Sequence, residues 1–432
     1  MKISPSPIFF ILVFLLLFFQ NESQACSMYK LTADGKTMVG CNEDAWRTTS
    51  RIWFETAKNE SEYGAAFTGS RKVGPNQFAP QSGMNTVGLT FSRLVSYFPK
   101  SDQKSDKKNI TNEVSYLTEI LHTCATVADV KRFIEQYDHS IFIGDVFIYI
   151  DSSGNYLVVE PYDLIEGSDQ YYVLSNFCPS ITTNDKARKL ERYRNGEDLL
   201  TNHTPNASLD FCTAVSDTMH VCRSRNGDGT LLTSIWDTKE GLVNLYFYHS
   251  YDSTVQFDIA DELAQGDHII NVASLFPTNP EFERLASFKT PFNTASLRVS
   301  LVILAGILTL LAFSFIVFSL RNRKTDSAYK NLIFISGLNV ALTFYFFVLA
   351  TNIGIYYFDA PFKHYSSSLI SMSSYMPFLL LIITVPIFTY TIRFVRNAGA
   401  KAGIKSLLVA NNLIYLLSII AFAYWGLFNF WN

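Results

Sequence analysis

Residues 26–44 read CSMYKLTADGKTMVGCNED and contain the clearest indication of the fold. A β-rich run leads from Cys26 to Asp34-Gly35, a dipeptide that is typical of tight hairpin turns. A second β-rich run leads from this turn into the polar segment Gly40–Asp44. The stretch therefore predicts a β-hairpin that begins at a cysteine and ends in a short polar segment.

The residues before Cys26 have the pattern of a secretory signal peptide, residues 1–25. A basic start is followed by an uninterrupted apolar run over 8–19, which is too short for a membrane span of about 20 residues. The small residues Ser23 and Ala25 suit a signal peptidase that cuts after Ala25. An uncleaved anchor and a lipoprotein are the alternatives. The short apolar run disfavours the first, and Ser23 in place of the usual leucine disfavours the second.

Cleavage after Ala25 would make Cys26 the first residue of the mature chain. An α-amine has a pKa near 7.7–8.0 and can accept a proton at neutral pH, and a cysteine thiolate is a strong nucleophile. One residue would then supply both the nucleophile and the base. The alternative is a structural cysteine that happens to follow a signal peptide.

Residues 26–285 predict an exported domain of the α+β class. Helical spacing occurs in 112–137 and 185–200. Short β-rich runs lie at Met38–Cys41, Val87–Phe91, Val146–Ile150, Tyr156–Val159 and Tyr171–Leu174. Strands, then helices, then strands again favour a layered α+β domain over a parallel βαβ fold.

The C-terminal part, after a linker over 286–297, predicts four transmembrane helices within 298–432. The apolar stretches are 299–320, 331–353, 369–392 and 406–428. Basic residues follow the first span and separate the third from the fourth, so the positive-inside rule puts both of these loops in the cytoplasm. This topology leaves residues 26–285 outside the cytoplasm. The spans contain no acidic residue, so we expect an anchor or a platform for lipid-like substrates rather than an ion pump.

Composition excludes several classes of function. The 432 residues carry a net charge of −3, which offers no basic footprint for nucleic acid. No HExxH, GxSxG, Walker or GxGxxG motif is present, and we expect neither a cofactor nor a metal. The His220-x-Cys222 spacing is too weak to indicate a metal site. Cys212 and Cys222 could close a small disulfide loop, although the pairing of the six cysteines is not deducible.

The hairpin and five later motifs resemble those of the N-terminal nucleophile (Ntn) hydrolases of the choloylglycine hydrolase, penicillin V acylase and acid ceramidase group. That family begins with Cys-Thr, a hairpin and Gly-Arg-Asn-x-Asp. The later matches are Gly83–Leu89 to GxNxxGL, Ile150–Glu160 to a hairpin ending in Glu, Ser175–Phe177 to a Thr-Asn strand end, Glu191–Tyr193 to an Arg-bearing helix and Thr233–Asp237 to a late strand. The resemblance covers most of 26–250 and none of the membrane part.

The resemblance implies an αββα four-layer domain and a set of catalytic residues. Cys26 would be the nucleophile, and Asp44 would hold and orient its α-amine. Asn85 and Asn176 would donate hydrogen bonds to the oxyanion of the tetrahedral intermediate. Arg192 would fix the site electrostatically, with Arg188 as the alternative.

One position departs from the family pattern, because Cys41 stands where the family has arginine. Two consequences are open: loss of the arginine alters the pKa of the nucleophilic thiol, or Arg47 or Arg192 replaces its positive charge. A disulfide between Cys41 and Cys26 would block the enzyme under oxidation.

The function implied is a membrane-anchored amidohydrolase that cleaves linear, non-peptide amides of N-acyl lipids or bile-salt-like substrates through an acyl-thioester. Its partners would be an amphipathic amide and a lipid bilayer. Acyl transfer to an amine and a catalytically inactive receptor or sensor are the alternatives. The acyl chain, the amine and the oligomeric state stay open.

Overall fold

The computed structural model describes residues 26–45, 48–75, 77–101, 106–222, 229–322, 327–356, 368–397 and 399–428. The expected signal peptide, Arg47 and the chain after residue 428 lie outside the described residues. The chain forms two compact units, one over Gln24–Ser287 and one that includes Phe288–Asn432. The six cysteines are all free thiols, so the Cys212–Cys222 disulfide is not formed.

The first unit contains two large antiparallel sheets. The first sheet has the order β14 (Tyr171–Leu174), β1 (Ser27–Ala33), β2 (Lys36–Ala45), β15 (Gly229–Asp237), β16 (Leu242–Phe247) and β17 (Ser250–Asp258). The second has the order β13 (Leu164–Gly167), β12 (Tyr156–Val159), β11 (Asp145–Ile150), β8 (Thr90–Val95), β7 (Ser82–Asn85), β4 (Ala65–Gly69), β3 (Arg51–Glu55) and β18 (His268–Asn271). Two short ribbons pair β5 (Arg71–Gly74) with β6 (Gln77–Ala79) and β9 (Lys108–Asn109) with β10 (Tyr137–Asp138).

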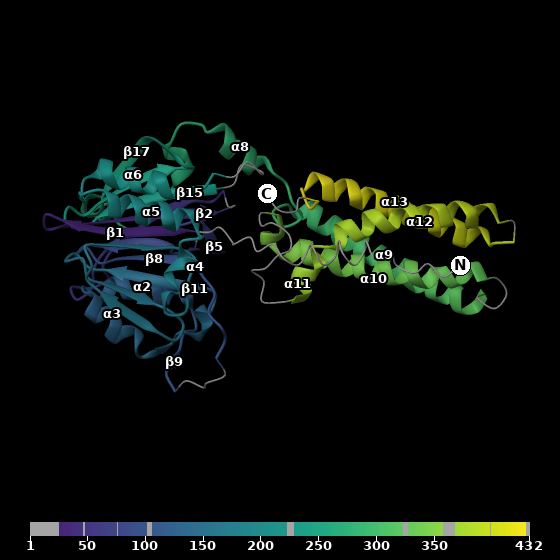
Figure 1. Ribbon diagram of the computed structural model, residues 1–432, viewed down its shortest axis with the longest axis horizontal. Helices are drawn as coiled ribbons and strands as arrows, with labels where there is room; N and C mark the ends of the chain where they lie inside the picture. Colours follow the sequence, from purple (N-terminus) through teal and green to yellow (C-terminus); the bar gives the residue numbers. More distant parts are fainter. Residues whose placement is uncertain are drawn as a thin grey trace. The chain divides into compact units, whose positions relative to one another are not determined.

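Helices cover the outer face of each sheet. The helices α5 (Glu191–Asn202) and α6 (Leu209–Met219) pack on the first sheet, and α2 (Glu113–Thr123) and α3 (Val127–Ile134) pack on the second. Figure 1 shows the resulting layers in the order helix, sheet, sheet, helix. The inner faces of the sheets meet, for example where the hydroxyl groups of Ser82 and Ser234 lie 3.1 Å apart. The expected α+β class is confirmed.

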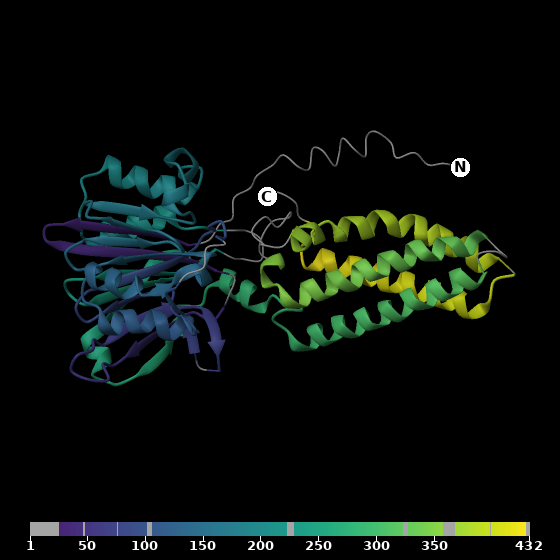
Figure 2. The same cartoon turned by 90° about the horizontal axis from the view of Figure 1, so that it is seen from below.

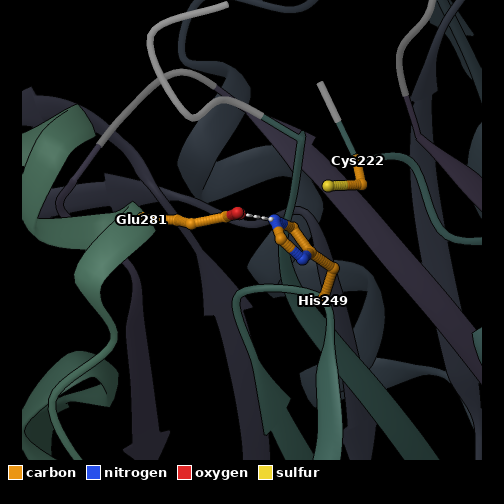
Figure 3. A group of neighbouring side chains, drawn as sticks. All are labelled: Cys222, His249 and Glu281. Carbon is orange, nitrogen blue, oxygen red and sulfur yellow. Dashed lines mark ion pairs between the residues drawn. The ribbon is translucent and has the colours of Figure 1, made fainter. Parts of the chain in front are cut away.

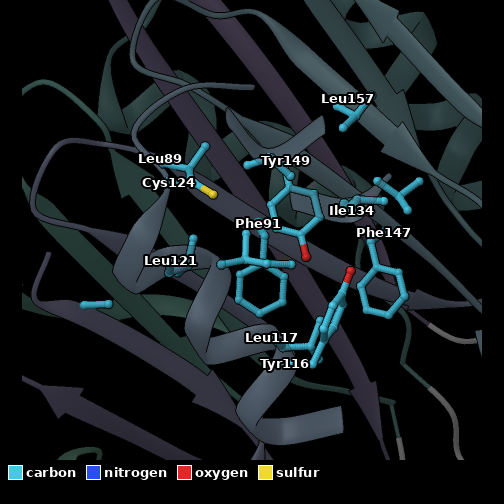
Figure 4. Packing of buried hydrophobic residues seen from close by; sticks show 14 of the residues in the cluster. Leu89, Phe91, Tyr116, Leu117, Leu121, Cys124, Ile134, Phe147, Tyr149 and Leu157 are labelled. Atoms are coloured by element: carbon cyan, nitrogen blue, oxygen red, sulfur yellow. The ribbon is translucent and has the colours of Figure 1, made fainter. Parts of the chain in front are cut away.

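The larger of the two apolar cores lies between the second sheet and its helices. Tyr116, Leu117 and Leu121 of α2 pack against Phe91 and Tyr149 of the sheet (Figure 4). Each of these helices begins at a side-chain cap. Asn112 accepts from the backbone N–H groups of Val114 and Ser115, and Thr126 forms a capping box with Asp129.

The β1–β2 hairpin forms as the sequence predicts. Ala33 pairs with Lys36, and the two residues between them, Asp34 and Gly35, have φ angles of 52° and 69°. Two consecutive positive φ angles define the turn that matches the twist of a hairpin. Tyr29 and Leu31 of β1 face the helices, so Cys26 and Met28 face the second sheet.

Two boundaries differ from the sequence prediction. The strand expected at Val87–Phe91 begins only at Thr90, because the Asn85 side chain accepts hydrogen bonds from the backbone N–H groups of Val87 and Leu89 and holds a turn. The helical stretch 112–137 is two helices, since α2 ends before Cys124 and Thr126 starts α3.

The described residues also form four shorter α-helices, α4 (Asn184–Ala187), α7 (Ile259–Leu263), α8 (Pro280–Ser287) and α11 (Ser368–Ser373). Five 3₁₀ turns lie at His139–Phe142, Pro179–Ile181, Val272–Leu275, Ser327–Asn331 and Ile353–Tyr356.

The second unit contains the four long apolar helices that the sequence predicts. They are α9 (Ala295–Asn322), α10 (Leu332–Thr351), α12 (Met376–Arg396) and α13 (Ala402–Tyr424), and each is long and apolar enough to cross a membrane. Figure 2 shows them side by side.

Buried amide groups join the interior of this bundle. Asn339 of α10 donates to Asn411 Oδ1 of α13 at 2.8 Å, and Asn412 donates to Thr391 Oγ1 of α12 at 2.8 Å. Such hydrogen bonds hold helices together where lipid removes the hydrophobic driving force.

Candidate active site

Cys26 lies at the start of β1, on the face that meets the second sheet, and is only 5% exposed. Its thiol lines a small pocket between the sheets, with a cavity volume of about 10 Å³, which is about the room that one water molecule needs. The other lining residues are Cys41, Asn42, Glu43, Thr68, Gln81, Ser82, Ser92, Arg93, Leu232 and Ser234.

The neighbours of the Cys26 thiol offer both a hydrogen-bond donor and negative charge. Gln81 Nε2 donates to Cys26 Sγ at 3.4 Å. Burial raises the pKa of the Cys26 thiol to about 12, and the charges of Asp44 and Glu43 add to the rise. The backbone of Asp44 and the guanidinium of Arg192 act in the opposite direction. In this form of the chain the thiol is therefore protonated at neutral pH.

A buried ion pair lies on the face of β2 that points away from the Cys26 pocket. Arg192 Nη1 is 3.4 Å from Asp44 Oδ2, and the two side chains are 3% and 1% exposed. Thr230 Oγ1 donates to the other oxygen of Asp44 at 2.6 Å. Asp44 thus has a guanidinium on one carboxylate oxygen and a hydroxyl on the other, which keeps its charge compensated inside the protein.

Arg192 also connects this pair to Cys26. Its Nε donates to Ser175 Oγ at 2.8 Å, and Ser175 Oγ donates to the backbone carbonyl of Cys26 at 3.2 Å. A second guanidinium nitrogen donates to Asn176 Oδ1. The Asn176 amide in turn donates to the carbonyl of Val95 at 2.6 Å. One arginine therefore orders Asp44, Ser175 and Asn176, and it reaches Cys26, the residue before β1, through Ser175.

The structure thus brings together Cys26, Asp44, Asn176 and Arg192. Arg188, the alternative to Arg192, lies before α5 and instead forms ion pairs with Glu197 and Asp198 of that helix.

Asn85 is not part of this group. Its Nδ2 donates to the carbonyls of Leu121 and Cys124, both at 2.8 Å, and its Oδ1 accepts from the backbone of the following turn. It stands at the end of β7 furthest from Gln81, and three residues of strand span about 10 Å. The expectation that Asn85 faces the nucleophile does not match this placement, because its amide ties β7 to the end of α2.

Cys41 occupies the same pocket as Cys26. Burial raises the pKa of its thiol to about 12, while hydrogen bonds with Ser92, Ser82 and Ser234 oppose the rise. On paired antiparallel strands Met28 faces Cys41, so Cys26 and Cys41 are diagonal neighbours. Position 41 therefore holds a neutral thiol among serine hydroxyl groups, where the family pattern has a positively charged arginine.

Three residues of the group did not emerge from the sequence: Gln81, Ser175 and Thr230. Ser175 precedes Asn176 inside a motif that the sequence singled out, and that proximity was the available signal. Gln81 is a single polar residue before β7 and Thr230 is a single polar residue within β15. No local sequence pattern marks either residue as part of a site.

Comparison with known proteins gives structural similarities only. No protein-family model and no curated protein matches the chain. Two variants of conjugated bile acid hydrolase from Clostridium perfringens are similar at 15% identity, with TM-scores of 0.44 and 0.45, over 59% of this chain and 97% of theirs. Penicillin V acylase from Agrobacterium tumefaciens is similar at 16% identity, with a TM-score of 0.43, over 57% of this chain and 90% of its own.

Proposed function

We propose that residues 26–287 are a cysteine Ntn amidohydrolase that cleaves linear, non-peptide amides of amphipathic N-acyl compounds. The observation that carries the proposal is the position of Cys26. Its thiol lines a pocket between two sheets, and Ser175 donates to its backbone carbonyl. Arg192 links Ser175 to Asp44 and Asn176.

The proposed reaction begins when removal of residues 1–25 frees the α-amine of Cys26. The amine accepts the thiol proton, and the resulting ammonium favours the thiolate beside it. The sulfur attacks the amide carbon, and the C–N bond breaks as the ammonium returns its proton to the leaving amine. Water then attacks the thioester, which releases the carboxylic acid and restores the thiol.

The surroundings of the pocket support this assignment of roles. Gln81 and Asn176 are amide donors close to the start of β1, and such donors stabilise an oxyanion by roughly 3–4 kcal/mol each. The Asp44 carboxylate lies at the same end of the hairpin, where it can attract a free ammonium at Cys26.

The test compares the two thiols of one pocket. Full-length chain in detergent, kept reduced, is incubated with N-acyl amides of graded acyl length, and amine release is measured. We expect Cys26→Ala and Cys26→Ser to abolish release, because a serine hydroxyl is far less acidic than a thiol. Cys41→Ser is the matched control and should stay active. Asn176→Ala should slow turnover by about 100- to 1,000-fold.

Intact mass measurement supplies the second readout. It should show a mature chain that begins at Cys26 and an acyl adduct that Cys26→Ala lacks. Full activity in Cys26→Ala would refute the assignment of the nucleophile. A wild type that cleaves nothing and whose Cys26 resists thiol reagents would favour the receptor interpretation instead.

A further inference from the structure

A second group of reactive side chains lies elsewhere in the first unit. Cys222 forms an isolated bridge with Gly229, His249 lies in the turn between β16 and β17, and Glu281 lies in the first turn of α8. Their ligand atoms, one sulfur, one imidazole nitrogen and one carboxylate oxygen, all lie within 4.8 Å of one another. Figure 3 shows the three side chains converging from three separate segments.

The fold fixes two of these side chains independently of any ligand. Tyr248 and His249 form the two-residue turn, with φ angles of 54° and 44°. The ring of Phe282 packs on Phe247 and Tyr248 at centroid distances of 4.8 and 5.4 Å. This packing holds α8 against the turn and places Glu281 beside His249.

The Nε2 atom of His249 lacks the partner that a buried nitrogen normally has. The His249 side chain is 10% exposed, and among the described residues its buried Nε2 makes no hydrogen bond. The nearest carboxylate oxygen, Glu281 Oε2, is 3.4 Å away. His268 and Glu262, in contrast, form a direct contact of 2.8 Å.

The distance of 3.4 Å between His249 Nε2 and Glu281 Oε2 fits a metal ion bound to both atoms. Nitrogen and oxygen ligands bind zinc at about 2.0–2.2 Å, and a tetrahedral angle then separates them by about 3.4 Å. The two atoms therefore stand apart by the distance that a shared zinc ion requires.

We propose that Cys222 Sγ, His249 Nε2 and a Glu281 carboxylate oxygen bind one zinc ion, with water at the fourth position. Thiolate, imidazole and carboxylate are the ligands that zinc takes in proteins, and three of them with an open position are typical of reactive sites. Binding exchanges the Cys222 S–H bond for an S–Zn bond and releases one proton to solvent.

Neighbouring His220 is not available as a fourth ligand through Nδ1. Its ring stacks on that of His249 at a centroid distance of 6.0 Å, and its Nδ1 lies 3.0 Å from Asp217 Oδ1.

Two residues, Val221 and Thr230, connect the proposed zinc site to the candidate active site. Val221, next to Cys222, donates its N–H to Thr230 Oγ1 at 2.8 Å, and Thr230 Oγ1 donates to Asp44 Oδ1 at 2.6 Å. A metal that holds Cys222 would therefore also hold the hydroxyl that orients Asp44. The zinc proposal itself is independent of any amidase activity.

The experiment measures metal directly. Full-length chain in detergent, with a phosphine reductant and a tag without histidine, is stripped with a chelator and titrated with Zn²⁺ or Co²⁺. We expect one tightly bound zinc ion per chain. The cobalt form should show the intense d–d bands of tetrahedral Co²⁺ and a thiolate-to-cobalt charge-transfer band.

Variants identify the ligands. Cys222→Ser should remove the charge-transfer band, and Cys222→Ser, His249→Ala and Glu281→Gln should each weaken binding by more than the roughly 10- to 100-fold lost with a second-shell partner. Glu262→Gln and His268→Ala, from the hydrogen-bonded pair, are the matched controls and should bind zinc normally. Because Cys222 is exposed, Cys222→Ser should fold as the wild type does. A wild type without stoichiometric metal, or unchanged affinity in Cys222→Ser, overturns the proposal.

Discussion

Asp44 and Arg192 form the buried ion pair that organises the candidate site. Removing one partner of such a pair leaves the other charge without compensation in the interior. Arg192 also donates to Ser175 and Asn176, so its loss would release three side chains at once.

The first prediction concerns this arginine. Arg192→Ala should lower the free energy of unfolding by about 3–5 kcal/mol and abolish amide cleavage. Urea unfolding followed by tryptophan fluorescence measures the stability. Arg188→Ala is the matched control from the same region, since its pairs with Glu197 and Asp198 are partly exposed to solvent, and it should change stability little. Equal losses in the two variants would contradict the role given to Arg192.

The structure brings four of the five predicted site residues together and places Asn85 apart from them, for a physical reason, while the roles of all five stay predictions. Cys26 and Asp44 are ends of one hairpin, so a local pattern is enough to pair them. Asn85 shows where a local pattern fails. An asparagine before a glycine turn can point its amide at a ligand or at its own backbone, and here it holds the turn. Gln81 reaches Cys26 only because two sheets stack, which no local pattern records.

The hairpin of β1 and β2 depends on a glycine at one cross-strand position. Tyr29 pairs with Gly40, and the tyrosine ring lies over the glycine while its hydroxyl bonds to the carbonyl of Cys212 and lies 3.1 Å from Ser216 Oγ. A Cβ atom at position 40 would stand 2.3 Å from two carbons of that ring.

The second prediction follows from this contact. Gly40→Ala should destabilise the first unit by about 1–3 kcal/mol, as overpacking of a core does, because both ends of the Tyr29 ring are held. Gly144→Ala is the control, since the nearest atom to a Cβ there is 3.9 Å away. Thermal unfolding distinguishes the two. Similar melting temperatures for both variants would show that the ring moves aside freely.

At the level of elements, the sequence predicted which segments are strands better than it predicted their neighbours. The β1–β2 pair is local, and a two-residue turn determines it. β18 joins the edge of the second sheet beside β3, although more than 200 residues lie between them. That pairing depends on the packing of the whole unit. The helix boundaries near Cys124 depended on the caps at Asn112 and Thr126, which a periodicity of apolar residues does not reveal.

The whole chain combines the first unit with four apolar helices, and its charges predict a topology. We expect the loops 321–330 and 393–405 to lie in the cytoplasm, and 354–367 and Asn432 to lie outside, because arginine and lysine concentrate in the first two. Single reporter sites labelled with a membrane-impermeant reagent in intact cells test this. Labelling of 393–405 from outside would reverse the topology.

A further prediction concerns the stability of the whole first unit at alkaline pH. Burial raises the pKa of Cys41 and Cys212 from 9.0 to about 12. Above pH 9 the unfolded chain loses these protons and the folded chain keeps them, so the free energy of unfolding should fall as pH rises. Each thiol should contribute about 1.4 kcal/mol per pH unit. Urea unfolding of the reduced chain at several pH values measures this slope. Cys41→Ser should make the slope shallower by the contribution of one thiol. An identical slope would contradict the prediction.

The depth at which the chain's first strand lies also sets an order of events in time. Cys26, Ser27 and Met28 are 5%, 1% and 0% exposed, and a peptidase must hold several residues on both sides of the bond it cuts in an extended, accessible form. Once β1 pairs with β2 and β14, the residues after the bond are out of its reach. If the proposed cleavage after Ala25 takes place, it therefore has to occur during the proposed export, before the hairpin closes. A chain that folded first would keep the bond before Cys26 and would lack the free α-amine on which the proposed mechanism depends.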